Sequence, residues 1–153
     1  MRANHQKIAV LVDRFKGGAF DAHYLGYFEC FNQQLYFEAH EVLECLWLEV
    51  RGRPLDLFYK ALIQLAGAFV HLQKNRRAPA VALFGLARRN FEQYPRYCQG
   101  LDLKTVLETI NRYLQDLNKA HPSGALFDPQ HAPKLWPGDL GESNRSMEPV
   151  RSS

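Results

Sequence analysis

Residues 31–51 read FNQQLYFEAHEVLECLWLEVR, and this stretch decides the fold. After the polar break at residues 32–34, apolar side chains recur every three or four residues, which predicts an amphipathic helix over residues 35–51. At about 100° per residue, His40 and Glu44 fall on its apolar side, where neither is expected. The predicted core side as a whole carries Phe37, His40, Leu43, Glu44, Trp47 and Leu48.

The same period continues along the chain and predicts an all-α fold, a single compact bundle of about five helices. The predicted helices cover residues 21–33, 35–51, 56–75, 79–94 and 103–119. Asp21, Asp56 and Asp102 are placed as N-caps, and Pro79 as a first helical residue. Because the connection between the second and third helices is short, we expect these two to be antiparallel and central. No stretch alternates with the period of a strand.

The 153 residues suit one domain, which we expect over residues 21–137. Residues 1–20 are interpreted as an N-terminal extension, with a short helical pattern over 6–15 that ends before a Gly-Gly pair. Residues 138–153 are polar and small, and we expect them to be disordered. Leu135 and Trp136 are expected to dock against the bundle. With no long apolar run and no leader pattern, we expect a cytoplasmic protein without a membrane segment.

Charge is distributed unevenly, although the chain has a net charge of only +3. Residues 36–51 have a net charge of −3, and residues 74–96 have one of +5. Either these charges are solvated helix faces, or the basic region meets nucleic acid or another anionic partner. The odd number of cysteines, without a C-x-x-C pair, predicts neither a disulfide framework nor a zinc knuckle. Homo-oligomerisation stays open.

A second polar stripe is predicted on the third helix, which is otherwise apolar nearly all round. Lys60, Gln64, His71 and Asn75 share one side of it at about 100° per residue. A buried carboxylate such as Glu44 needs hydrogen-bond donors or a raised pKa. Antiparallel packing would bring donors from the third helix to it. We therefore expect one buried polar cluster formed by His40, Glu44, Gln64 and His71.

Four interpretations of this cluster stay open. It is a hydrogen-bond network that fixes helix register, or it lines a pocket for a small ligand or anion. As a third interpretation, His40, Glu44 and His71 hold a divalent metal ion, although the H-E-x-x-E spacing is not that of zinc proteases. As a fourth, Glu44 and His71 transfer protons as a catalytic pair.

Two motifs give the chain a resemblance to a known family. Phe31-Asn32 with YFEAHEVLE over residues 36–44 and Trp47 is similar to the first motif of the family called domain of unknown function 309. LIQLA over residues 62–66, with His71 and Asn75, resembles its second motif. The resemblance implies a small all-α bundle without an established activity. It marks as site residues His40, Glu41, Glu44, Trp47, Gln64, His71 and Asn75.

The resemblance also has departures, since Gln34, Ala61 and Lys74 stand where the family is expected to have glycine. Gln34 and Lys74 are therefore expected to change a turn and a helix end. Two classes of function remain. The first is a binding or scaffold module whose polar cluster sets its shape. The second is a metal-assisted or acid–base enzyme, most plausibly a hydrolase, centred on Glu44, His40 and His71.

Overall fold

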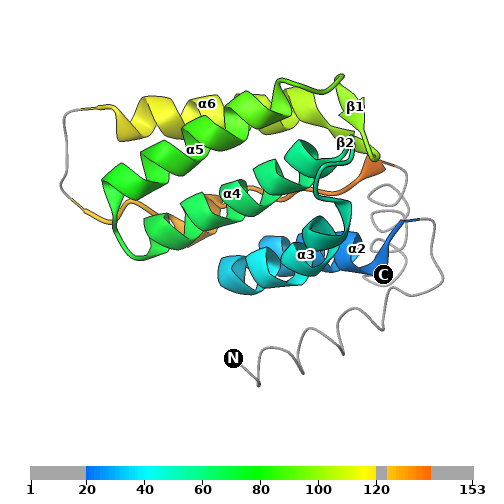
Figure 1. The fold of residues 1–153 in the computed structure, drawn as a ribbon. Coiled ribbons are helices and arrows are strands. Elements are labelled where there is room, and N and C mark those ends of the chain that lie inside the picture. The colour runs from blue at the N-terminus through cyan, green and yellow to red at the C-terminus, as the bar shows by residue number, and fades with distance from the viewer. Residues whose placement is uncertain (1–19, 120–123, 139–153) are drawn as a thin grey trace, which may run out of the picture.

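The computed structural model describes residues 20–119 and 124–138. It contains five helices and a two-stranded hairpin, which confirms the predicted all-α fold. The elements, labelled in Figure 1, are α2 (Ala22–Asn32), α3 (Tyr36–Val50), α4 (Asp56–Gln73), α5 (Arg77–Phe91), β1 (Tyr97–Cys98), β2 (Leu101–Asp102), α6 (Leu103–Leu117) and the short 3-10 helix η1 (Pro129–His131). The predicted arm over residues 6–15 and the predicted tail after 138 lie outside the described residues.

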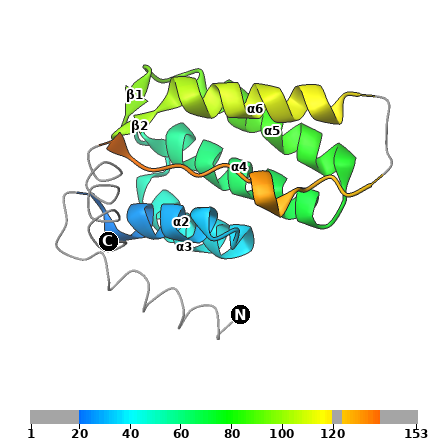
Figure 2. The ribbon, with the colours of Figure 1, turned by 180° about the vertical axis from the view of Figure 1, so that it is seen from behind.

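The helices form two layers. Helices α3, α4 and α5 make the layer that faces the viewer in Figure 1, with α3 and α4 antiparallel as predicted. Seen from behind, in Figure 2, α2 and α6 lie on either side of an extended segment that crosses the bundle. We call this segment, residues 124–138, the strap.

Aromatic rings fill the space between the layers, and Phe69 of α4 is their meeting point. Its ring centroid lies 4.9 Å from that of Tyr36 on α3 and 5.0 Å from that of Tyr113 on α6. It also lies 5.4 Å from the centroid of Phe31 on α2 and 5.3 Å from that of Phe84 on α5. Such contacts add to the free energy gained from burying the rings. One residue therefore ties four helices to α4.

The ends of the helices follow the sequence closely in two places. Asp21 and Asp102 are N-caps as predicted, accepting hydrogen bonds from the backbone N–H of His23 at 2.7 Å and of Lys104 at 3.1 Å. Helix α5 begins at Arg77, two residues earlier than predicted, so Pro79 is its third residue. A proline is tolerated there, since the first N–H groups of a helix have no acceptor within it.

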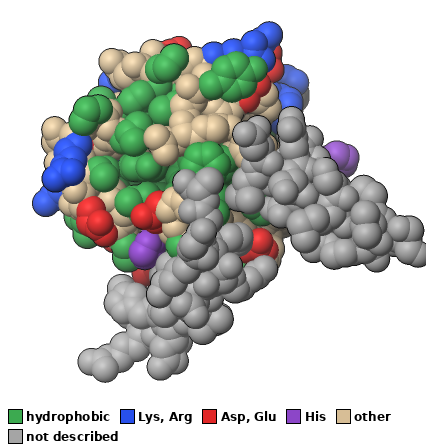
Figure 3. Space-filling model, turned by 90° about the vertical axis from the view of Figure 1, so that its right-hand side faces the viewer, with side chains coloured by type: hydrophobic (Ala, Val, Ile, Leu, Met, Phe, Trp, Pro, Cys, Tyr) green, Lys and Arg blue, Asp and Glu red, His purple; other side chains and the backbone are tan. Residues whose placement is uncertain are grey.

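The hairpin β1–β2 was missed. It pairs only Tyr97 with Asp102 and Cys98 with Leu101, and so is too short to leave an alternating pattern. Its turn residues Gln99 and Gly100 have φ of 49° and 74°, as a two-residue hairpin requires. Figure 3 views this end of the molecule, where apolar side chains reach the surface between charged ones.

The strap docks through Leu135, which is buried, and Trp136, which packs partly buried on the core, as predicted. Its last residue, Gly138, donates a backbone hydrogen bond to the carbonyl of Gly100 in the hairpin turn. A Cβ on Gly138 would lie 2.8 Å from that carbonyl oxygen, so the contact requires a glycine. No helix among the described residues is long and apolar enough to cross a membrane.

Candidate functional site

Helix α3 turns a different side to the core from the one predicted. Its buried residues are Tyr36, Ala39, Val42, Leu43 and Leu46. Of the predicted core side only Leu43 is buried, while Phe37 is 45% exposed and Leu48 is 52% exposed. The helix carries apolar residues on two sides, so its periodicity alone did not decide which of the two is buried. The side with the small Ala39 is the one that packs, since a small residue lets neighbouring helices approach closely.

Glu44 is exposed, which corrects the prediction of a buried carboxylate. His40, Glu41, Trp47, Gln64 and His71 are each half-buried. The predicted residues therefore do not form a closed cluster inside the bundle. Those on α3 and α4 lie at its surface, on the α3–α4–α5 layer.

The indole N–H of Trp47 serves Asp56 and not Glu44. Its Nε1 donates to Asp56 Oδ1 at 2.7 Å, and the backbone N–H of Gly52 donates to Asp56 Oδ2 at 2.8 Å. The Gly52 hydrogen bond, and after it that of Trp47, holds the pKa of Asp56 below its usual value. Asp56 was predicted as the N-cap of α4, but the N-cap residue is Leu55. Asp56 closes the loop between α3 and α4 instead.

Contacts at both ends of the α3–α4 pair fix its register. Tyr36 stacks on Phe69 near one end, and Trp47 bonds to Asp56 near the other. His40 is therefore level with about Gln64, seven residues before His71. At 1.5 Å per residue, those seven residues correspond to about 10 Å along α4.

Glu44 is farther still from His71, because it is level with about Lys60. The separation along the helix axis is then about 16 Å. The structure does not bring Glu44 and His71 together as a catalytic pair. Among the described residues, no three His, Cys, Asp or Glu side chains are grouped as a metal site needs, and this includes His40, Glu44 and His71.

His40 and His71 share an unusual feature. The Nδ1 atom of each ring is buried and has no hydrogen-bond partner. Among the described residues, the only other such side-chain atom is the hydroxyl oxygen of Tyr36. Partial burial, and after it the charges of Arg76 and Lys74, lower the pKa of His71. His71 is therefore neutral at pH 7, and its ring nitrogens offer one donor and one acceptor.

The remaining predicted residues have partners of other kinds. Gln64 Oε1 accepts a hydrogen bond from Asn90 Nδ2 of α5 at 2.9 Å. Asn75 Oδ1 accepts one from the backbone N–H of Leu126, in the strap, at 2.9 Å. Asn75 thus belongs to the opposite side of the bundle and not to the histidine face.

Two residues that hold the strap were missed. Asn32 bonds to Leu135 twice, accepting from its N–H and donating to its carbonyl, both at 2.8 Å. Gln34 donates to the carbonyl of Pro129 at 2.8 Å. The sequence signal was Asn32 itself, which belongs to the first motif but was interpreted as part of a polar break between helices.

Gln34 and Lys74 were expected to change a turn and a helix end relative to the family, and this stays a prediction. Gln34 has φ of 64°, the left-handed conformation that a glycine would adopt there. Lys74 has φ of −91°, and the left-handed residue at that helix end is Asn75, with φ of 59°. The left-handed backbone conformation at Gln34 costs free energy for any residue other than glycine.

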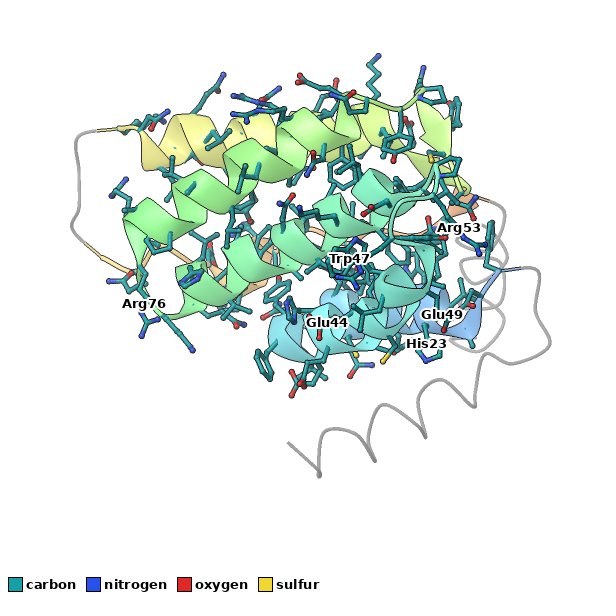
Figure 4. The ribbon with its side chains drawn as sticks, viewed as in Figure 1. His23, Glu44, Trp47, Glu49, Arg53 and Arg76 are labelled. Atoms are coloured by element: carbon teal, nitrogen blue, oxygen red, sulfur yellow. The ribbon has the colours of Figure 1, made fainter. Side chains whose placement is uncertain are left out.

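Three of the six basic side chains in residues 74–96 are hydrogen-bonded within the molecule. Arg77 donates to the carbonyl of Leu117, Arg88 to Asn111, and Arg96 to Asp102. Arg76 lies at the turn between α4 and α5, far from Arg53 at the other end of α4 (Figure 4). Positive charge near the histidine face is therefore concentrated at Lys74 and Arg76.

Comparison with known proteins agrees with the motifs. Residues 24–83 match the family described as Domain of unknown function (DUF309), the family that the chain was predicted to resemble. The matched stretch runs from α2 into α5, so it includes both half-buried histidines but not the strap. Among curated proteins and solved structures, none matches this chain.

Proposed function

We propose that the DUF309 domain of this chain, residues 24–83, is a binding module. Its ligand-facing surface is the exposed side of α3 and α4, which we call the histidine face. It is defined by His40, Trp47, Gln64 and His71. The observation that carries the proposal is the buried, unpaired Nδ1 of both histidines.

The free energy of hydrogen bonding supports this function. A buried polar atom without a partner costs about 1–3 kcal/mol, and folded proteins leave few of them. Apart from the hydroxyl of Tyr36, the described side chains leave no other buried polar atom unpaired, and Asn32, Asp56 and Asn75 are each hydrogen-bonded. Two such atoms on one half-buried surface fit a site that a ligand, or water before it, completes.

The surroundings of His71 indicate the class of ligand. A neutral imidazole can accept a hydrogen bond, and Lys74 and Arg76 beside it raise the local potential. Half-buried Trp47 adds an apolar surface toward the other end of the face. We infer a small anionic molecule that also carries a hydroxyl or amide donor. The surface is about 10 Å long between Gln64 and His71, so an extended molecule fits it better than a compact ion.

Histidine side-chain nitrogen spectra test this proposal. The ¹⁵N resonances of the six imidazoles are recorded while hydroxycarboxylates and sugar phosphates are added one at a time. We expect a saturable shift at His71 and His40 but none at His131, which is exposed and already bonded to Asp128. A matched titration of the Lys74→Gln variant should need a higher concentration for the same shift. Equal shifts at all histidines, or none with any member of the panel, would contradict the proposal.

A further inference from the structure

Helix α3 has a side with no covering element among the described residues. It carries exposed Phe37 and Leu48 at its two ends, with exposed Glu44 between them. In Figure 4, Trp47 lies toward α4, while Glu44 and Glu49 lie farther from it. Phe37 and Leu48 lie on the same side of α3, so together they offer apolar contacts to a second helix.

The charge of this helix points to the occupant. Helix α3 contains four glutamates and neither lysine nor arginine. Residues 1–19 contain Arg2, Lys7, Arg14 and Lys16 against Asp13 alone, a net charge of +3. The segment is thus complementary in charge to α3.

The apolar pattern of the segment agrees with its charge. Ile8, Leu11, Val12 and Phe15 are spaced i, i+3, i+4 and i+7, which is one side of a helix. Lys7 and Arg14, themselves seven residues apart, flank that stripe at about 100° to 120° from Ile8. Val10 lies on the opposite side, so only one side of the segment is suited to packing.

The linker fits as well. The described chain starts at Phe20, just before α2, and α2 is antiparallel to α3, so this point lies near the level of Leu48. Residues 16–19 can span about 13 Å, somewhat more than the 8–10 Å between packed helices. A helix over 6–15 is about 15 Å long, close to the separation of Phe37 and Leu48 on α3.

We propose that residues 6–15 dock as an amphipathic helix, parallel to α3, on the side that carries Phe37, Glu44 and Leu48. Phe15 then packs near Leu48, and Val12 lies near Cys45. Lys7 and Arg14 face the glutamates of α3. The docked segment covers α3 beside the histidine face, and this interaction is independent of the ligand proposed above.

A cross-link between thiols tests the docking in the full chain. Cys45 is exposed, whereas Cys30 and Cys98 are buried, so Cys45 is the reactive native thiol among them. Val12→Cys is treated with a short bismaleimide in dilute protein, and the linked peptides are identified by mass spectrometry. Val10→Cys is the matched control, since it adds the same thiol on the opposite side of the segment.

We expect the Val12→Cys link to Cys45 to form on the order of tenfold faster than the Val10→Cys link, because docking raises the effective concentration of one thiol only. Adding Leu11→Asp, which places a charge in the apolar stripe, should remove the difference, whereas Gln6→Asp should keep it. Equal rates for the two cysteines would overturn the proposal. So would a link that forms only between an isotope-labelled and an unlabelled chain, since the occupant would then be a second copy.

Discussion

Polar side chains differ between the strap side of this bundle and the histidine face. On the strap side, Asn32, Gln34 and Asn75 are each bonded to a backbone group of residues 124–138. On the histidine face, His40 and His71 each keep a buried nitrogen without a partner. Motif residues occur on both sides, so a shared motif does not mean a shared role. On the strap side the chain itself supplies the hydrogen-bond partners, and on the histidine face it does not.

The largest effect should come from breaking the strap side. Asn32→Ala removes both hydrogen bonds to Leu135 and leaves its buried N–H and carbonyl without partners. We expect the free energy of unfolding to fall by about 2–3 kcal/mol, measured by urea denaturation. Asn111→Ala is the matched control, because Asn111 is exposed and bonds only to an arginine. Equal losses in the two variants would mean that the bonds between Asn32 and Leu135 stabilise the fold no more than an exposed hydrogen bond does.

The next effect belongs to the loop that joins the two central helices. Trp47→Phe keeps the aromatic ring but removes the donor to Asp56, and should cost about 1 kcal/mol. The folded state lowers the pKa of Asp56 from 3.8, so its stabilisation is present above pH 3.8 and is lost as pH falls through the lower folded value. In Trp47→Phe this loss on acidification should be smaller than in the parent.

Thermal unfolding between pH 2.5 and 6 measures both quantities. Trp136→Phe is a suitable control, since Trp136 is also half-buried on the core, whereas the indole that bonds to Asp56 is that of Trp47. An unchanged pH profile in Trp47→Phe would show that the indole does not contribute to the lowered pKa of Asp56.

The sequence predicted the helices well because their ends are decided locally. Asp21 and Asp102 each accept a hydrogen bond from an N–H group two residues away, so the sequence alone identifies these caps. Leu135 and Trp136 stood out as two adjacent large apolar residues between Pro133 and Pro137. By contrast, the hairpin at residues 97–102 has too few residues for a period.

The site was harder to predict because it depends on which side of α3 is buried. Tyr36, Ala39, Leu43 and Leu46 form one apolar stripe, while Phe37, Trp47 and Leu48 belong to another. The choice between them is made by α2 and α4, through contacts such as Tyr36 with Phe69. The sequence alone does not show those contacts, so it could not decide which stripe is buried, and Glu44 was predicted to face the core. The motifs located the right helices, but not the side that reaches solvent.

A smaller effect of opposite sign should appear on the histidine face. His71→Phe replaces a ring with an unpaired buried nitrogen by an apolar ring of similar shape. We expect the free energy of unfolding to stay equal or to rise by up to about 1 kcal/mol, because a polar group is no longer buried unpaired. His131→Phe should instead lose a little stability, since its nitrogen is bonded to Asp128. A loss of more than about 1 kcal/mol in His71→Phe would favour a structural role for the imidazole.

The smallest effect is expected at Glu44, and it separates the two interpretations of that residue most directly. A carboxylate inside a charged network would be destabilised when neutralised, whereas an exposed one would not. Glu44 is exposed, so Glu44→Gln should change the free energy of unfolding by less than about 0.5 kcal/mol. Asp56→Asn is the matched comparison, because that carboxylate accepts from Trp47 and Gly52, and its neutralisation should cost measurably more. Equal losses of stability in the two variants would show that Glu44 belongs to a hydrogen-bond network. A loss at Asp56 alone would leave Glu44 as a surface charge, free to act on whatever binds α3.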